Sequence, residues 1–294
     1  MTMTNVTDVS NQVQTFWSET FMDELMEAVL LPALVNKEFE GELKKKGDTV
    51  RVSQINRATA TRKSVGSGHE YFETQKLSTS YVDIVADQVI SAGYEFDDLV
   101  ELQSQIGDKD SKIRQGLLEA YAIELNNYCY ELVDPSTSSP DHSVSGVGAM
   151  DAAALVANRK LAGQAKWARN GGWWGLLDPS YWADILSATT LTSADYVPDA
   201  PVVGGQSAMK RFGFNLLEDN SDGLLTLSPA SAGEECGLFF HPDFLYLVHQ
   251  LVPEFQVSSL HSNKQFGYVI SVKAVVGAKK GIDGGVKQIV NYDS

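Results

Sequence analysis

Apolar side chains recur at three- and four-residue steps in two long stretches of the sequence, residues 16–34 and 111–133. This spacing predicts two helices. Asp110 or Ser111 would cap the start of the second helix and Pro135 follows its end; at 1.5 Å per residue it would be roughly 35 Å long. The first helix, which Pro32 would end, has little neighbouring sequence to pack on. We therefore expect it to dock elsewhere on the fold or on another copy of the chain.

Alternation of apolar and polar residues predicts two strands, at residues 49–53 and 79–84. A long polar stretch with Gly66 and Gly68 at its tip joins them. Together they form an extended hairpin with few apolar residues of its own. Because such a hairpin gains little from burying itself, we expect it to need a partner surface.

Short helices and strands alternate beyond a turn-rich boundary at residues 134–148. Helices are predicted at residues 152–162, 180–188 and 242–251. Strands are predicted at residues 173–177, 213–217, 237–240, 267–276 and 289–292. This mixture, in a chain of 294 residues that is 43% apolar and 21% charged, excludes a disordered, collagenous or coiled-coil protein.

Charge is unevenly distributed along the chain. The formal net charge is −15, which disfavours tight binding to nucleic acid or to an anionic membrane. We hypothesise that basic residues of the hairpin lie over the acidic strip of a neighbouring copy, although both runs are also compatible with simple solvated faces. The basic residues are Lys44, Lys45, Lys46, Arg51, Arg57, Arg62 and Lys63, and the acidic strip is Glu95, Asp97, Asp98 and Glu101.

Candidate chemistry is sparse. Cys129 and Cys236 are too few for a disulfide framework or a zinc site. His241 and His249 are eight residues apart on a predicted helix, roughly 12 Å by rise, which is too far for one metal ion. No secretory signal or membrane-spanning run stands out. We therefore predict no enzyme activity, no cofactor, no metal and no membrane partner.

One aromatic cluster admits two interpretations. Tryptophan and tyrosine side chains can stack on sugars, and Asp178 and Asp184 could supply carboxylates for a carbohydrate-active hydrolase. Large aromatic residues also dominate protein cores and interfaces, which is the interpretation that strand and helix positions favour here. The cluster comprises Trp167, Trp173, Trp174, Tyr181 and Trp182.

Several short stretches, in this order and spacing, carry a family resemblance. They include Phe16-Trp-Ser18, Gly47-Asp-Thr-Val-Arg-Val52, Trp174-Gly-Leu-Leu-Asp-Pro179, Phe240-His-Pro-Asp243 and Gly267-Tyr-Val-Ile-Ser271. With the acidic lead-in at residues 90–104 and the long helix after it, the chain resembles the major capsid proteins of tailed bacteriophages, from Phe16 to the last strand.

The resemblance implies an α+β, HK97-like capsid fold. Its parts would be an N-terminal arm (1–36), an extended β-hairpin loop or E-loop (37–80), a peripheral domain with a long spine helix (81–138), an axial α/β domain (139–266) and returning strands of the peripheral domain (267–294).

The resemblance also implies an icosahedral shell around a double-stranded DNA phage genome. The partners would be further copies of the chain, as hexamers and pentamers, a separate scaffolding protein and a portal, with the need for a decoration protein left open. DNA would be contacted weakly, and the protein would be made in the bacterial host cytoplasm and reside in the virion capsid. The alternatives are an encapsulin-like nanocompartment shell and, from another class, the carbohydrate-active hydrolase.

Overall fold

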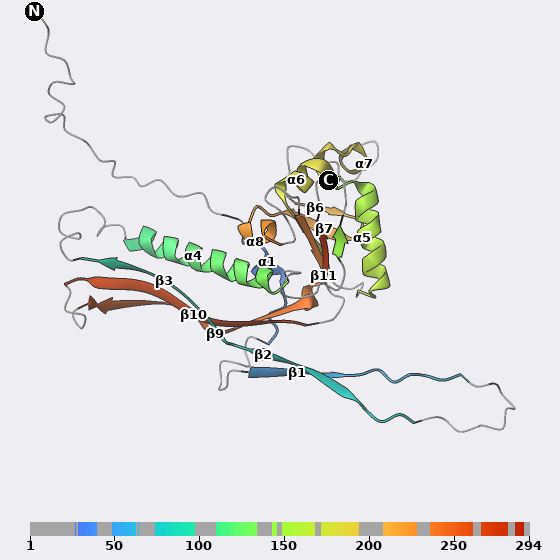
Figure 1. Cartoon of the computed structure of the whole chain (residues 1–294), viewed down its shortest axis with the longest axis horizontal. Helices are drawn as coiled ribbons and strands as arrows, with labels where there is room; N and C mark the ends of the chain where they lie inside the picture. The colour runs from blue at the N-terminus through green and yellow to red at the C-terminus, as the bar shows by residue number, and fades with distance from the viewer. Residues whose placement is uncertain are drawn as a thin grey trace, which may run out of the picture.

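The strands form three sheets in the part of the chain that the structure describes. The structure is a computed structural model and describes residues 27, 29–39, 49–62, 64, 74–97, 110–133, 143–145, 149–167, 172–193, 208–227, 236–260, 266–281 and 286–290. Figure 1 shows an elongated molecule: a long sheet with one helix along it, a second sheet with several helices at one end, and a narrow two-stranded arm.

The predicted hairpin is the two-stranded sheet. β1 (Thr49–Ile55) and β2 (Thr79–Val85) are antiparallel, with Arg51 opposite Asp83. Both strands occur where alternation predicted them. We call residues 49–62 and 74–85 the arm.

The second sheet has the order β3-β10-β9 and is antiparallel throughout. Its strands are β3 (Gln88–Phe96), β10 (Tyr268–Lys280) and β9 (Leu245–Ser259). The long helix is confirmed as α4 (Asp110–Glu131), which covers one face of this sheet (Figure 1). Leu117, Leu125 and Cys129 of α4 are buried in one core with strand residues such as Ile90 and Val272.

The third sheet has six strands in the order β4-β11-β8-β5-β7-β6. They are β4 (Ser143–Ser145), β11 (Val286–Val290), β8 (Cys236–Phe240), β5 (Trp173–Leu177), β7 (Phe214–Glu218) and β6 (Ala208–Arg211). The helices near it are α5 (Ala152–Gln164), α6 (Pro179–Ser187), α7 (Thr189–Thr192) and α8 (Asp222–Leu225). Both faces of β5 are buried: Leu176 joins the α4 core while Trp173 and Leu177 join a second core under α5 and α6.

The helix predicted at residues 242–251 is wrong. Pro242–Phe244 forms one 3₁₀ turn, and β9 begins at Leu245. An apolar run buried on both sides has no clear period, so pairing with β10 decides its conformation. His241 and His249 therefore do not share a helix.

The N-terminal helix ends differently from the prediction. Glu27, Val29 and Leu30 are not helical, and α1 (Leu31–Leu34) is a single turn that begins next to Pro32, where proline is favoured. Residues 1–26 of the predicted helix and tail lie outside the described residues.

Sheet membership crosses two of the predicted domain limits. β9 lies within residues 139–266 yet pairs with β10, and β11 lies within residues 267–294 yet pairs with β8 and β4. β4 itself falls in the stretch predicted as a turn-rich boundary. The named domains stay a prediction.

Candidate assembly surfaces

The arm is a narrow ribbon held by polar contacts between its two sides. Arg51 donates to both carboxylate oxygens of Asp83, from Nε at 2.7 Å and from a terminal nitrogen at 2.9 Å. Its guanidinium also lies 4.2 Å from the ring centroid of Tyr81. The hydrogen bond from Arg51 lowers the pKa of Asp83 below its ordinary value. Beyond the strands, Thr59 and Gln75 exchange two hydrogen bonds, at 3.0 and 3.2 Å.

Three large apolar side chains on the arm are open to solvent. Ile55 is 68%, Leu77 75% and Tyr81 60% exposed. Large exposed apolar groups on so thin an element indicate a contact surface for another molecule.

The root of the arm is fixed to the body by a small core of Val50, Ile84 and Val248. A Cβ atom on Gly277 of β10 would lie 2.1 Å from the carbonyl oxygen of Val85, so only glycine allows the two backbones to approach this closely. The direction in which the arm leaves the body is therefore set by packing at its root.

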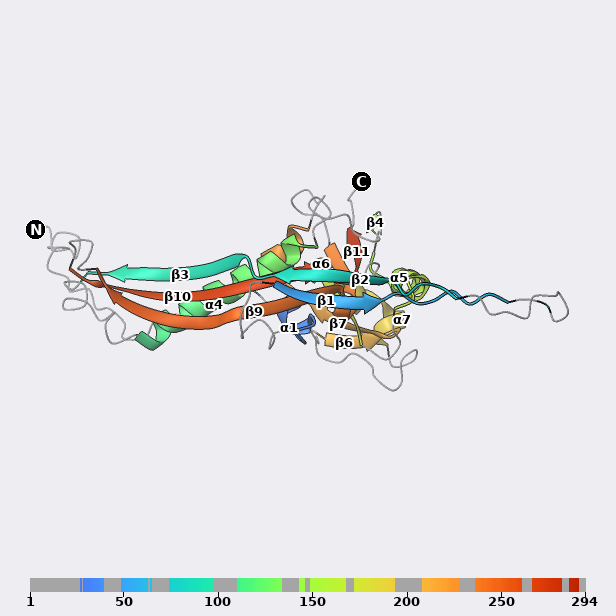
Figure 2. The ribbon, with the colours of Figure 1, turned by 90° about the horizontal axis from the view of Figure 1, so that it is seen from below.

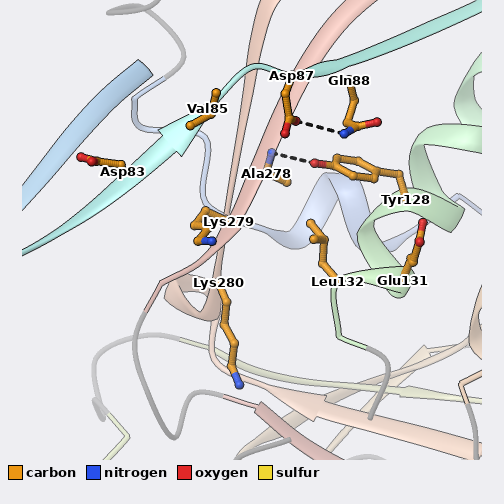
Figure 3. A pocket seen from close by; sticks show the side chains of 10 residues that line it. All are labelled: Asp83, Val85, Asp87, Gln88, Tyr128, Glu131, Leu132, Ala278, Lys279 and Lys280. Carbon is orange, nitrogen blue, oxygen red and sulfur yellow. Dashed lines mark hydrogen bonds between the residues drawn. The ribbon is translucent and has the colours of Figure 1, made fainter. Parts of the chain in front are cut away.

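A cavity of ≈ 520 Å³ lies at this joint, between the arm root, β3, β10 and the end of α4 (Figure 3). The hydroxyl of Tyr128 accepts a hydrogen bond from the backbone of Ala278 at 3.3 Å, and burial raises the pKa of this tyrosine. That hydroxyl thus ties α4 to β10. The charged lining residues are Asp83, Asp87, Glu131, Lys279 and Lys280. The cavity marks a joint, and we assign it no reaction.

The predicted charged residues divide into three groups. Arg57 and Arg62 are exposed on the arm, and Glu95 and Asp97 are exposed at the end of β3. Arg51 is engaged by Asp83 of its own arm. Lys44, Lys45, Lys46, Lys63, Asp98 and Glu101 lie outside the described residues.

The arm and the acidic end of β3 lie at opposite ends of the long axis. Figures 1 and 2 show the arm running away from the body in one direction while the end of β3 points in the other. The two therefore do not meet within one chain.

An apolar patch beside Glu95 and Asp97 was missed by the sequence analysis. Tyr94 of β3 and Val257 of β9 both face Ile270 in the register of the sheet, and they are 51% and 58% exposed. The rings of Phe96 and Tyr268 stack at 5.5 Å. Alternation at residues 88–96 could have identified the strand, but its acidic residues masked that signal. We call Tyr94, Phe96, Val257 and Tyr268 the distal patch.

The aromatic cluster is a core, as the second interpretation predicted. Trp167, Trp173 and Trp182 are at most 7% exposed, and the first two rings lie edge to face at 5.7 Å. Asp178 accepts from the backbone of Tyr181 at 3.0 Å, which caps α6, while Asp184 accepts from the backbone of Met150 at 3.0 Å. These carboxylates organise local structure, so the hydrolase interpretation gains no support.

Within the described residues, no three His, Cys, Asp or Glu side chains are grouped to hold a metal ion. The helices in that same part of the chain include none long and apolar enough to cross a membrane. Cys129 and Cys236 are buried and are not joined in a disulfide, and burial raises the pKa of Cys129 to about 12.

No protein-family model matches the chain, and a search of curated proteins gives no match. Solved structures do match it along nearly its whole length. A chain from Mycobacterium phage Che8 is 21% identical with a TM-score of 0.72, covering 95% of this chain and 97% of that one. A chain from the capsid of cyanophage P-SCSP1u is 12% identical with a TM-score of 0.74, covering 97% and 95%. One from the mature capsid of bacteriophage PhiM1 is 12% identical with a TM-score of 0.67, covering 96% and 93%.

These matches define the class of fold. The chain has the mixed helix and sheet architecture found in phage capsid structures. The nanocompartment and hydrolase alternatives gain no support from them.

Proposed function

We propose that this chain is a major capsid protein of a tailed bacteriophage, which assembles into an icosahedral shell around double-stranded DNA. The observation that carries the proposal is the match along 97% of this chain to a chain of the cyanophage P-SCSP1u capsid. A shell needs shape and contacts and no reacting groups, so the role is structural.

In an HK97-like subunit the arm would be the E-loop, and the sheet β3-β10-β9 with α4 would be the peripheral domain and its spine helix. The six-stranded sheet would be the axial domain. Copies would form hexamers and pentamers, with a separate scaffolding protein and a portal as further partners. The enclosed DNA would be contacted weakly by a chain of net charge −15.

Within that shell, the arm of one copy would lie on the distal end of the next. The arm offers exposed Arg57 and Arg62 with apolar side chains nearby, and the distal end offers Glu95 and Asp97 beside the distal patch. A contact between two different surfaces of the same chain repeats from copy to copy. The copies form a closed ring if the rotation between neighbours allows it. Each exposed ion pair contributes only about 0–1 kcal/mol, so repetition and the apolar contacts carry the stability while the charges fix the register.

The test of function is assembly. The protein is expressed alone and with its candidate scaffolding protein, then analysed by size-exclusion chromatography and negative-stain microscopy. Closed polyhedral particles or rings of five and six copies are expected. A persistent 32.1 kDa monomer in both preparations, at all salt and protein concentrations, would overturn the proposal.

The test of the arm contact is a charge swap. Arg57→Glu with Arg62→Glu should weaken assembly and reduce its dependence on salt. Adding Glu95→Lys and Asp97→Lys should restore assembly, because the attraction returns with its sign reversed. Assembly that is unchanged by the first pair of substitutions would remove this contact while leaving the capsid role intact.

A further inference from the structure

The loop between β6 and β7 contains an aromatic residue in an unfavourable backbone conformation. Arg211 pairs with Phe214, so the loop is only Phe212 and Gly213, and their φ angles are 48° and 89°. Positive φ at both positions is what a type I′ hairpin turn requires, and asparagine followed by glycine satisfies it best. A bulky side chain at the first position is strained.

The other described non-glycine residue with positive φ has an ordinary explanation. Lys166, at φ 60°, follows the end of α5, and its backbone N–H donates to the carbonyl oxygen of Gly163. Helices commonly end with one residue in this conformation. Phe212 does not follow a helix. Asparagine would make the same turn with less strain, so the turn alone does not explain a phenylalanine there.

The loop cannot relax, because side chains on both sides hold it. Arg159 of α5 donates to the carbonyl oxygen of Phe212, and its guanidinium lies 5.4 Å from the ring centroid of Trp173. On the other side, Arg211 Nε donates to the carbonyl oxygen of Leu191 at 3.0 Å. Phe212 is nevertheless 40% exposed, so burial within the chain only partly offsets the strain. Backbone strain at Phe212 that burial does not fully offset indicates that this residue recognises another molecule.

The surface around Phe212 has the composition of a binding site for an acidic protein. Val156 of α5 is exposed and lies one helical turn from the exposed Arg159 and Lys160, and this helix contains no acidic residue. Figure 1 shows α5 on the outer flank of the six-stranded sheet. A rigid aromatic group with arginine and an aliphatic neighbour is typical of interface hot spots.

We propose that this hairpin surface, made of Phe212, Val156, Arg159 and Lys160, binds an acidic surface on a second copy of the chain. The occupant follows from charge: the surface is basic, whereas the chain as a whole has a net charge of −15. The proposal rests on the self-assembly described above and adds a second contact, on a different part of the fold from the arm. The fixed loop lowers the entropy lost on binding.

The test uses one substitution with two opposite effects. Phe212→Asn should raise the melting temperature of the unassembled subunit by about 2–4 °C, because the strain is relieved. It should also raise the protein concentration needed for half-maximal assembly by about ten-fold, because a central contact is lost. Leu225→Gln is the matched control, since Leu225 is also 40% exposed, and it should leave assembly unchanged. Val156→Gln alters the same surface without touching the loop and should weaken assembly as well.

The outcomes separate this inference from the capsid role. Shells that form equally well with Phe212→Asn and Val156→Gln would overturn the inference alone. If the wild-type chain forms only small oligomers in sedimentation velocity experiments, without closed shells, dissociation of these oligomers by both substitutions would still support the inference. A wild-type chain that stays monomeric would overturn both. If assembly is kept but binding of a fluorescent single-stranded DNA oligonucleotide is lost, the surface binds nucleic acid and the second-copy proposal fails.

Discussion

The six-stranded sheet and the arm differ in where their apolar side chains are. In the sheet, Phe214 and Phe239 are fully buried, and their rings lie edge to face at 5.0 Å. In the arm, burial stops at the root, and Ile55 and Tyr81 further out are more than half exposed. Since buried apolar area is the main stabilising term in folding, the sheet is held by its own residues. We therefore expect the arm to gain its stability from contact with another molecule.

The largest loss of stability is expected when an aromatic ring is removed from the six-stranded sheet. Phe239→Ala leaves a cavity between β5, β7 and their helices, so we expect the free energy of unfolding to fall by about 3–5 kcal/mol. Urea denaturation followed by tryptophan fluorescence measures it. Tyr81→Ala on the arm should leave the same denaturation curve in place yet reduce assembly. Equal losses of stability in the two variants would show that the contrast between the regions is false.

A smaller effect is expected where the arm joins the body. Gly277→Ala would place a Cβ atom 2.1 Å from the carbonyl oxygen of Val85, and two backbones cannot yield to it cheaply. We expect a loss of about 1–3 kcal/mol, with faster hydrogen exchange in β1 and β2. Gly163→Ala is the control: nothing lies within 4 Å of its Cβ, and it lies inside α5, so it should stabilise the chain by about 0.5–1 kcal/mol. Unchanged exchange in the arm of Gly277→Ala would mean that the root does not set its direction.

The sequence predicted those elements whose period is local and clear. The step of three and four residues along α4 and the alternation along β1 and β2 each point to one structure, and both were confirmed. Residues 242–251 were predicted as a helix that opens at Pro242, because proline is favoured in the first turn of a helix. Pairing of β9 with β10, in which Leu247 lies opposite Ala278, decides the strand conformation instead.

The surfaces that we propose for assembly could be identified from the sequence only in part, for a related reason. Charge runs are visible along a chain, so Arg57, Arg62, Glu95 and Asp97 could be proposed from it. The distal patch is assembled across three strands, and Phe212 is notable only for its backbone conformation. Neither feature can be recognised from the local amino-acid composition.

Alkaline pH should destabilise the buried core beneath α4. Burial raises the pKa of Cys129 from an ordinary value of 9.0 to about 12. Between pH 9 and pH 12 the folded chain therefore keeps the thiol proton while the unfolded chain loses it. The contribution of the buried thiol to stability is complete below pH 9 and declines between pH 9 and pH 12. The free energy of unfolding should fall by about 1.4 kcal/mol per pH unit in that window through this group. The difference between wild type and Cys129→Ala, measured by urea denaturation at pH 7 and pH 10, isolates it from the tyrosines. A constant difference would contradict the burial of the thiol.

The smallest effect is expected for the ion pair of the arm. Arg51 and Asp83 are bonded to each other but exposed, so Arg51→Gln should leave the melting temperature of the unassembled chain without a resolvable change. The hydrogen bond from Arg51 lowers the pKa of Asp83 below 3.8, so its contribution is present above that pH and is lost as pH falls through the lowered value. In Arg51→Gln, an NMR titration of the Asp83 carboxyl carbon should return the pKa toward 3.8. A large loss of melting temperature would instead mean that the arm is part of the cooperative fold and does not depend on another copy for its stability.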